Sequence, residues 1–144
     1  MRIYLDVCCL KRRFDEQTQP RVIEETAAVE LLLRLVARGS LEWISSAAME
    51  LENTRDPATD RRVETAELLA TASEYIAATT EITDRSSELE TAGFRPLDAL
   101  HLAMAESGAT VYFVTSDDLV LKRAARYGKL ACEVIDPVGL IRRL

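Results

Sequence analysis

Carboxylates stand close to short apolar runs in this sequence, at positions where an α/β protein can use them for chemistry. Asp6 directly follows the first apolar run, residues 3–5, and Asp117 comes shortly after the third run. Asp98 lies in the first turn of an expected helix that begins at Pro96, a residue favoured at helix starts. Ligands of open α/β sheets bind beyond the carboxyl ends of the strands, so these acids are candidates for one common site.

A further acid comes from the helix that we expect after the second apolar run. Glu50 and Glu52 both lie within two turns of the start of this helix. Residues two apart on a helix point about 200° away from one another, so only one of the two can face the site. The residues alone leave the choice between them open.

Such a cluster of carboxylates, with no lysine or arginine expected among them, requires a compensating cation. Two like charges about 5 Å apart repel by roughly 3 kcal/mol at an effective dielectric constant near 20, and burial increases the repulsion. Sites made of carboxylate oxygens select Mg²⁺ or Mn²⁺ over zinc. These ions hold a phosphodiester, lower the pKa of an attacking water and stabilise charge on the leaving oxygen. The acids therefore predict metal-assisted hydrolysis of a phosphoryl ester.

The elements that must position these acids alternate between short apolar strands and amphipathic helices. Strands are expected at residues 3–5, 41–44, 111–114 and 132–135. Helices are expected over residues 22–38, 46–53, 59–76, 82–91, 96–107 and 116–127, with a last helical turn after residue 137. The middle of the chain thus holds a helical hairpin. The pattern predicts an α/β fold with a parallel sheet of about four to five short strands, flanked by helices on both faces.

Length and composition limit the function classes. A chain of 144 residues is the usual size of one domain, so we expect a single domain over residues 1–144. Apolar residues make up 48% and charged residues 29% of the chain, which excludes a mainly disordered protein. The net charge of −6 argues against a protein that binds nucleic acid through bulk positive charge, so such a role would need local basic patches or metal ions.

The sequence gives no sign of a membrane or secreted location. No apolar run approaches the roughly 20 residues needed to span a bilayer, and Asp6 interrupts any N-terminal leader. The chain has 3 cysteines, an odd number that includes the adjacent pair Cys8 and Cys9, and this suits reduced thiols in the core better than disulfides. We therefore expect a cytoplasmic protein without membrane contact.

Three ordered segments of the sequence resemble the motifs of a PIN domain. They are Ile3-Tyr4-Leu5-Asp6-Val7-Cys8, Pro96-Leu97-Asp98-Ala99-Leu100-His101-Leu102-Ala103 and Phe113-Val114-Thr115-Ser116-Asp117-Asp118, and the resemblance covers essentially the whole chain. It implies a ribonuclease that depends on Mg²⁺ or Mn²⁺ and hydrolyses RNA phosphodiester bonds. In bacteria and archaea such proteins are often the toxin of a VapBC-type toxin–antitoxin pair, so the resemblance also implies an antitoxin partner and a homodimer.

The resemblance assigns roles to individual acids. Asp6 matches the first metal-binding acid of the family, Asp98 the third and Asp117 the fourth. Glu52 matches the second acid if the motif begins at Ser46 and ends at Asp56-Pro57, whereas Glu50 fits if the Glu-Leu pair is the guide. We favour Glu52. The implied site thus has Asp6, Asp98 and Asp117 as metal ligands, with Glu52 or Glu50 binding the metal or orienting its water.

Other polar residues near these motifs have simpler interpretations. His101 is expected to be packed or hydrogen-bonded rather than catalytic, and Thr115 could hydrogen-bond a ligating carboxylate. The basic residues 11–13, shortly after Asp6, could bind RNA phosphate or form solvated surface.

Two alternative functions follow from the same residues. One is a catalytically degenerate PIN-like module that binds RNA or protein without cleaving RNA, which the complete acid set disfavours. The other is a phosphoacceptor signalling domain, disfavoured because Asp6 has no acidic neighbour before Asp15.

Overall fold

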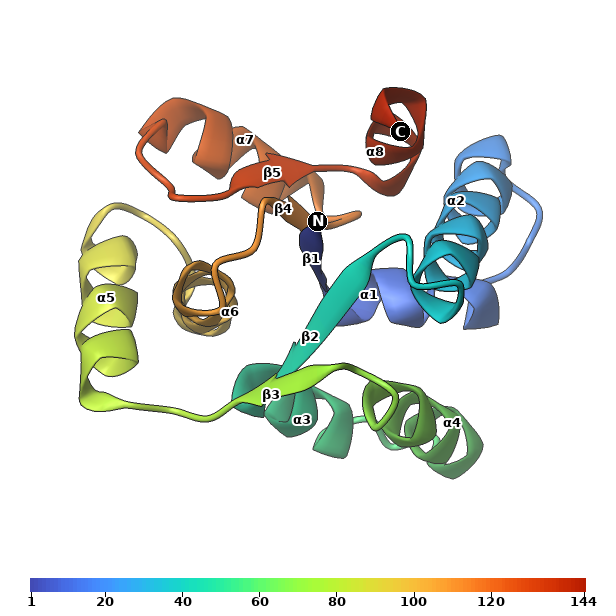
Figure 1. Cartoon of the computed structure of the whole chain (residues 1–144), viewed down its shortest axis with the longest axis horizontal. Coiled ribbons are helices and arrows are strands. Elements are labelled where there is room, and N and C mark those ends of the chain that lie inside the picture. The colour runs from blue at the N-terminus through green and yellow to red at the C-terminus, as the bar shows by residue number, and fades with distance from the viewer.

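The computed structural model describes residues 1–144 and contains one sheet of five parallel strands (Figure 1). The strands lie in the order β3-β2-β1-β4-β5. The chain builds outward from β1 to β3 and then returns to the other side of β1 for β4 and β5. β1 and β4 therefore flank the point where the strand order reverses, which is where open α/β sheets bind ligands. The strands are β1 (Arg2–Leu5), β2 (Glu42–Ser46), β3 (Glu74–Ile76), β4 (Tyr112–Val114) and β5 (Glu133–Ile135).

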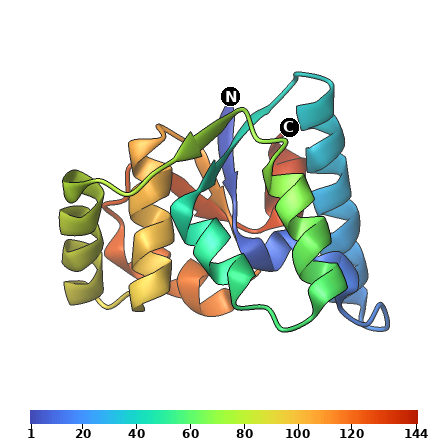
Figure 2. The ribbon, with the colours of Figure 1, turned by 90° about the horizontal axis from the view of Figure 1, so that it is seen from below.

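Helices cover both faces of the sheet, as the sequence predicted. The α5–α6 pair lies on one side, whereas α2 and α8 lie together on the other (Figure 1), and Figure 2 shows the same pairing from below. The helices are α1 (Val7–Leu10), α2 (Pro20–Ala37), α3 (Ala47–Thr54), α4 (Thr59–Leu69), α5 (Thr80–Thr91), α6 (Pro96–Ser107), α7 (Asp118–Tyr127) and α8 (Pro137–Arg143), with a short 3₁₀ helix, η1 (Arg12–Phe14).

The register of the central strands places their ends at one level. Leu5 pairs with Val114, the last residue of β4. The next residues continue the ladder, because the Asp6 amide donates to the Val114 carbonyl over 2.9 Å and the Thr115 amide donates to Ile135 over 3.0 Å. Asp6 and Thr115 therefore leave the sheet side by side at its carboxyl edge.

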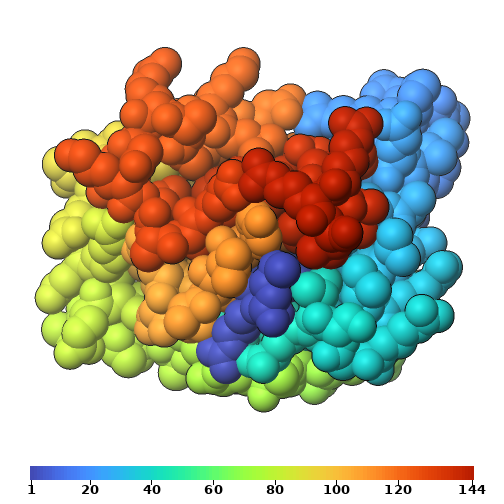
Figure 3. Space-filling view, turned by 45° about the horizontal axis from the view of Figure 1, so that its top comes forward, coloured from blue at the N-terminus to red at the C-terminus, as the bar shows by residue number.

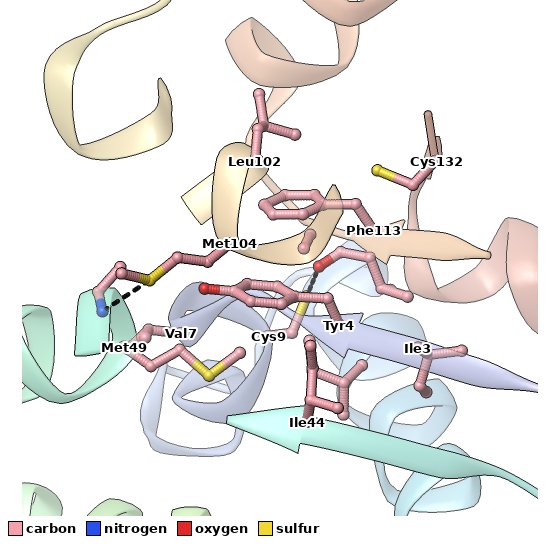
Figure 4. Packing of buried hydrophobic residues seen from close by; sticks show 14 of the residues in the cluster. Ile3, Tyr4, Val7, Cys9, Ile44, Met49, Leu102, Met104, Phe113 and Cys132 are labelled. Atoms are coloured by element: carbon pink, nitrogen blue, oxygen red, sulfur yellow. Dashed lines mark hydrogen bonds between the residues drawn. The ribbon is translucent and has the colours of Figure 1, made fainter. Parts of the chain in front are cut away.

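The core lies on both sides of β1 and directly beneath this edge. The ring of Tyr4 stacks on that of Phe113, with centroids 5.0 Å apart, and both side chains are fully buried (Figure 4). Cys9 lies below them, with its thiol against the Val114 carbonyl at 3.5 Å. Burial raises the pKa of the Cys132 thiol to about 11. The three cysteines are free thiols, and the two that are buried, Cys9 and Cys132, are small core residues.

The opposite edge of the sheet carries no candidate site residue. Figure 3 shows the first residues of the chain at the surface there, between the segments that lead into β2 and β4. Backbone hydrogen bonds join these segments, from Glu42 to Met1 over 2.9 Å and from Val111 to Arg2 over 2.8 Å. None of the helices is both long and apolar enough to cross a membrane.

The structure corrects the middle of the chain. The helix expected over residues 59–76 ends at Leu69, and residues 74–76 form the strand β3 beside β2. The Ser73 amide donates to the Trp43 carbonyl over 3.0 Å and so begins this pairing. β3 has three residues and buries only Ile76, so it leaves no apolar alternation that a sequence pattern could reveal. The one-turn helix α1 and the helix η1 were likewise not predicted.

Candidate metal centre at the carboxyl edge of the sheet

Asp6 is the most deeply placed carboxylate of the candidate site. Its residue is 6% exposed at the end of β1. One carboxylate oxygen accepts a hydrogen bond from the Val7 amide at 2.8 Å and begins α1, while the other accepts from the Thr115 hydroxyl at 2.8 Å. The predicted contact between Thr115 and a candidate ligand is thus present. These two bonds fix both oxygens of Asp6 in one orientation.

Glu52 and His101 face Asp6 from two different helices. Glu52 lies on α3 and His101 on α6, and potential ligand atoms of the three residues all lie within 4.8 Å of one another. His101 Nε2 lies 2.9 Å from Glu52 Oε1. Because a carboxylate only accepts hydrogen bonds, Nε2 is the donor here. The imidazole therefore orients Glu52 toward the end of β1.

A buried network of hydroxyl groups holds the His101 ring at its other nitrogen, Nδ1. The hydroxyl oxygen of Tyr4 lies 2.6 Å from both His101 Nδ1 and the Ser46 hydroxyl. Ser46 in turn accepts the Met49 amide as the N-cap of α3. Ser46 therefore does not touch the candidate ligands, and acts through Tyr4 and His101. Sequence reasoning missed Tyr4, because a tyrosine inside a buried strand looks like a core residue.

Electrostatics link the three groups. Burial raises the pKa of Asp6, and the nearby charges of Glu52 and Asp98 raise it further, while His101 and the Thr115 hydrogen bond oppose them. Burial alone would lower the pKa of His101, but its hydrogen bond to Glu52 and the negative charge of Asp6 outweigh burial, so the pKa is raised. The structure thus holds a buried acid beside further acids, an unfavourable arrangement that a cation relieves.

Asp98 and Asp117 lie at the more exposed side of the same edge. Asp98 is in the first turn of α6, three residues before His101, and Asp117 is the N-cap of α7. Asp117 accepts the Leu119 amide at 2.9 Å and donates its own amide to the Thr115 hydroxyl at 3.1 Å. Thr115 therefore connects Asp6 with Asp117.

One expectation about this cluster is wrong. We expected no lysine or arginine among the acids, yet Arg95 lies between two of them. Its Nε donates to Asp98 over 2.7 Å and its Nη2 donates to Asp117 over 2.6 Å. The three-residue step from Arg95 to Asp98 across the start of a helix is the sequence signal that could have revealed the first contact.

The two glutamates of α3 point to different places. Glu52 joins Asp6 and His101, whereas Glu50 lines a separate hollow between α3 and α4, together with Tyr75. The negative charge of Glu50, after burial, helps to raise the pKa of Tyr75. The geometry therefore places Glu52, and not Glu50, with the other acids. This agrees with the expectation that residues two apart on a helix, which point about 200° apart, cannot both face one site.

The basic residues after Asp6 are engaged elsewhere. Lys11 pairs with Asp56 at 2.7 Å, Arg12 pairs with the buried Glu25 at 2.9 Å, and Arg13 reaches Glu64 at 3.5 Å. These contacts fasten α1 and η1 to α2 and α4. Neither expected interpretation of residues 11–13, RNA-phosphate binding or solvated surface, included these ion pairs with acids of the same chain.

The donor set fits a divalent cation. Asp6 and Glu52 offer carboxylate oxygens beside a single imidazole nitrogen, and Asp98 and Asp117 add two further carboxylates at the rim. Carboxylate oxygens of this kind suit Mg²⁺ or Mn²⁺, whereas both nitrogens of the imidazole are engaged in hydrogen bonds to Glu52 and Tyr4. The residues present therefore fit such an ion by the chemistry of their donor atoms.

Comparisons with known proteins agree on the fold. No family model and no curated protein matches the sequence. Among solved structures, one chain of FitAB bound to an IR36 DNA fragment is similar with a TM-score of 0.57 and 14% identity, over 94% of this chain and 95% of that one. One chain of VapBC2 from Rickettsia felis, bound to a DNA fragment from their promoter, is similar with a TM-score of 0.59 and 13% identity, over 94% and 98%.

At these identities the likeness defines the fold. It extends over nearly the whole of both chains, and the parallel sheet with helices on both faces matches the fold class that the motifs indicated. The chain therefore has the PIN-like fold that was expected from its sequence.

Proposed function

We propose that this protein is a divalent-metal-dependent ribonuclease that hydrolyses RNA phosphodiester bonds. The observation that carries the proposal is the meeting of Asp6, Glu52 and His101, with potential ligand atoms within 4.8 Å of one another, at the point where the strand order reverses. Asp98 and Asp117 complete a set of four acids at this edge. The PIN-like fold, reached independently of the acids, supports the same class of activity.

Each residue has a task in this proposal. Asp6, Asp98 and Asp117 would hold Mg²⁺ or Mn²⁺, which when bound lowers the pKa of a water molecule and offsets negative charge on the phosphodiester. Glu52 would orient the water or contribute a further ligand oxygen. His101 and Tyr4 keep Glu52 in place, and Thr115 keeps Asp6 in place. Their buried hydrogen bonds prearrange the site on rigid elements.

We further propose that the protein is the toxin of a toxin–antitoxin pair, works in the cytoplasm and forms a homodimer. The support is the likeness to FitAB and VapBC2, structures that each hold DNA with their protein chains. An antitoxin is then the expected protein partner.

The test is cleavage of an end-labelled mixed RNA pool by purified protein, with Mn²⁺, with Mg²⁺ and with chelator. Wild type is expected to cut with either ion and to stop in chelator, whereas Asp6→Asn is expected to lose at least about a hundredfold in rate, as removal of a key charged group typically does. Asp84→Asn is the matched control, because Asp84 is an exposed aspartate of α5 outside the site. Equal cleavage in chelator, or by Asp6→Asn, would refute the proposal. No cleavage by wild type under any condition would also refute it and would leave the non-catalytic binding module.

A further inference from the structure

Arg95 lies between two of the candidate metal ligands. The guanidinium of Arg95 bridges Asp98 on α6 and Asp117 at the start of α7, with N···O distances of 2.7 and 2.6 Å. Its planar fork uses one nitrogen for each carboxylate. A positive side chain thus already sits where two of the acids would hold a cation.

The backbone of Arg95 is fixed but its side chain is free to leave. Arg95 is the N-cap of α6, ahead of Pro96 at the first helical position, and its carbonyl accepts the Ala99 amide at 2.8 Å. The side chain is 49% exposed, against 16% for that of Asp98. The guanidinium can therefore swing away without any change in the helix that carries Asp98 and His101.

Arg95 differs in its partners from the other basic residues nearby. Lys11, Arg12 and Arg13 pair with acids outside the cluster, and Arg21 pairs with Glu25 and Asp118. Only Arg95 pairs with candidate metal ligands. Both contacts use the Oδ2 atoms of Asp98 and Asp117, so a divalent ion that takes these oxygens competes with both ion pairs of Arg95.

A displaced guanidinium stays at the rim of the site because its backbone is anchored there. It then has five N–H donors without carboxylate partners, beside a metal that faces the substrate. A guanidinium fork matches two oxygens of a phosphate group. The same residue is therefore suited to two different partners in the two states of the site.

We propose that Arg95 is an exchange residue: it bridges Asp98 and Asp117 in the metal-free site, and binds a phosphate of the RNA once the metal takes these acids. This inference rests on the proposed ribonuclease function. It makes Arg95 both a competitor of the metal and a substrate-binding residue. The two roles have opposite consequences when the side chain is removed.

The experiment measures Mn²⁺ affinity and RNA affinity in the same variants. Mn²⁺ binding is followed by the electron paramagnetic resonance signal of the free ion, and KM for a short RNA is measured at saturating Mn²⁺. Arg95→Gln is expected to lower the Kd for Mn²⁺ by about two- to thirtyfold, the range that two exposed ion pairs provide, and to raise KM by about tenfold. Arg95→Lys keeps the charge but loses the fork, so its Kd should lie between those of wild type and Arg95→Gln.

The matched control is Arg143→Gln, which removes the same charge from an ion pair with Glu133, outside the site. It should leave both the Kd for Mn²⁺ and KM unchanged. An Arg95→Gln variant with the wild-type Kd, or a weaker one, overturns the competitor role, and an unchanged KM overturns the phosphate role. Failure of the ribonuclease proposal would look different, because wild-type protein would then bind no Mn²⁺ through Asp6 or cleave no RNA in any variant.

Discussion

The ionised carboxylate of Asp6 lowers the stability of the folded chain. The carboxylate is buried at the end of β1, and burial together with Glu52 and Asp98 raises its pKa. A raised pKa means that ionising Asp6 costs more in the folded chain than in the unfolded chain. The charged form of this residue therefore opposes folding at neutral pH unless a cation is bound.

Replacing Asp6 by asparagine should therefore stabilise the metal-free protein. We expect Asp6→Asn to raise the free energy of unfolding by about 0.5–2 kcal/mol at pH 7, the usual gain when a strained functional group is neutralised. The cost in folding free energy is present above the pKa that Asp6 has in the folded chain. It vanishes at a pH where the acid is protonated in both the folded and the unfolded chain. The gain should accordingly shrink as the pH falls toward about 4.

Urea denaturation with chelator, at several pH values, measures this difference. Asp84→Asn serves as the comparison, because Asp84 is exposed and should change the stability little at any pH. A less stable Asp6→Asn protein at neutral pH would contradict the interpretation that Asp6 is held at an energetic cost.

Tyr4 supports the site from within the core. Its hydroxyl lies 2.6 Å from His101 Nδ1 and 2.6 Å from the Ser46 hydroxyl, and all three residues are buried. Tyr4→Phe keeps the stacked ring but leaves these groups without their partner. We expect a loss of about 1–3 kcal/mol in the free energy of unfolding, the cost of an unsatisfied buried polar group.

Thermal or urea unfolding of Tyr4→Phe beside Tyr75→Phe isolates this effect. Tyr75 is half-exposed and makes no hydrogen bond through its hydroxyl, so its variant should stay within about 0.5 kcal/mol of wild type. Equal stability of the two variants would show that the hydroxyl of Tyr4 contributes nothing.

Residue types and their order were enough to find the acids, but not what holds them. The position of Asp6, Asp98 and Asp117 at one edge of the sheet could be predicted, because each stands at a strand end or a helix start. The contact of Arg95 with Asp117 joins residues 22 apart in sequence. It depends on how α6 and α7 are placed, which no local pattern specifies.

Among the helices, α6 carries much of the site. Asp98 in its first turn and His101 one turn later lie at the rim and in the interior of the cluster, and Arg95 caps the same helix. The sequence predicted this helix with its observed bounds, because Pro96 and Gly108 mark its ends. The strand β3 escaped prediction because its three residues have no apolar period.

The segment between α3 and α4 is held by one carboxylate. Asp56 accepts both nitrogens of the Arg61 fork at 2.8 and 2.9 Å, the Lys11 ammonium at 2.7 Å and the Ala58 amide at 3.0 Å. It thereby connects the start of α4 with the end of α1, close in sequence to Asp6. Arg61 and then Lys11 hold the pKa of Asp56 well below its usual range.

A lowered pKa makes Asp56 a pH-dependent source of stability. The contribution of the ionised carboxylate to the free energy of unfolding is fully present above the pKa of Asp56 in the unfolded chain, about 3.9. It is lost as the pH falls through the pKa in the folded chain. Asp56→Asn should therefore be less stable than wild type at pH 7, and the difference should narrow below about pH 4. Urea midpoints of the two proteins between pH 3 and pH 7 measure this dependence.

The matched change for this element is Asp60→Asn, since Asp60 lies exposed in the first turn of α4 without an ion pair. Asp60→Asn should lower the free energy of unfolding less than Asp56→Asn does at pH 7. A gap between Asp56→Asn and wild type that stays constant from pH 7 to pH 3 would contradict the role of the ionised carboxylate.

At the scale of the whole molecule, the doubly wound sheet brings acids from distant parts of the chain to one edge of an already acidic protein. The net charge is −6, and the basic residues near the site are paired with acids. A divalent ion bound at this edge would lower the local excess of negative charge where the proposed RNA substrate would approach. Metal binding should thus affect the stability of the entire fold, and not only the chemistry.

Mn²⁺ should raise the thermal midpoint of the protein, because the ligands are assembled only in the folded chain. At an ion concentration about one hundred times Kd, binding adds about 2.7 kcal/mol to the free energy of unfolding. One kcal/mol shifts the midpoint by about 2–4 °C in a chain near this length, so the expected rise is about 5–11 °C. Differential scanning fluorimetry with Mn²⁺ and with chelator measures it. Asp6→Asn should start higher without metal and gain little from Mn²⁺, so an equal rise in both proteins would place the bound ion away from Asp6.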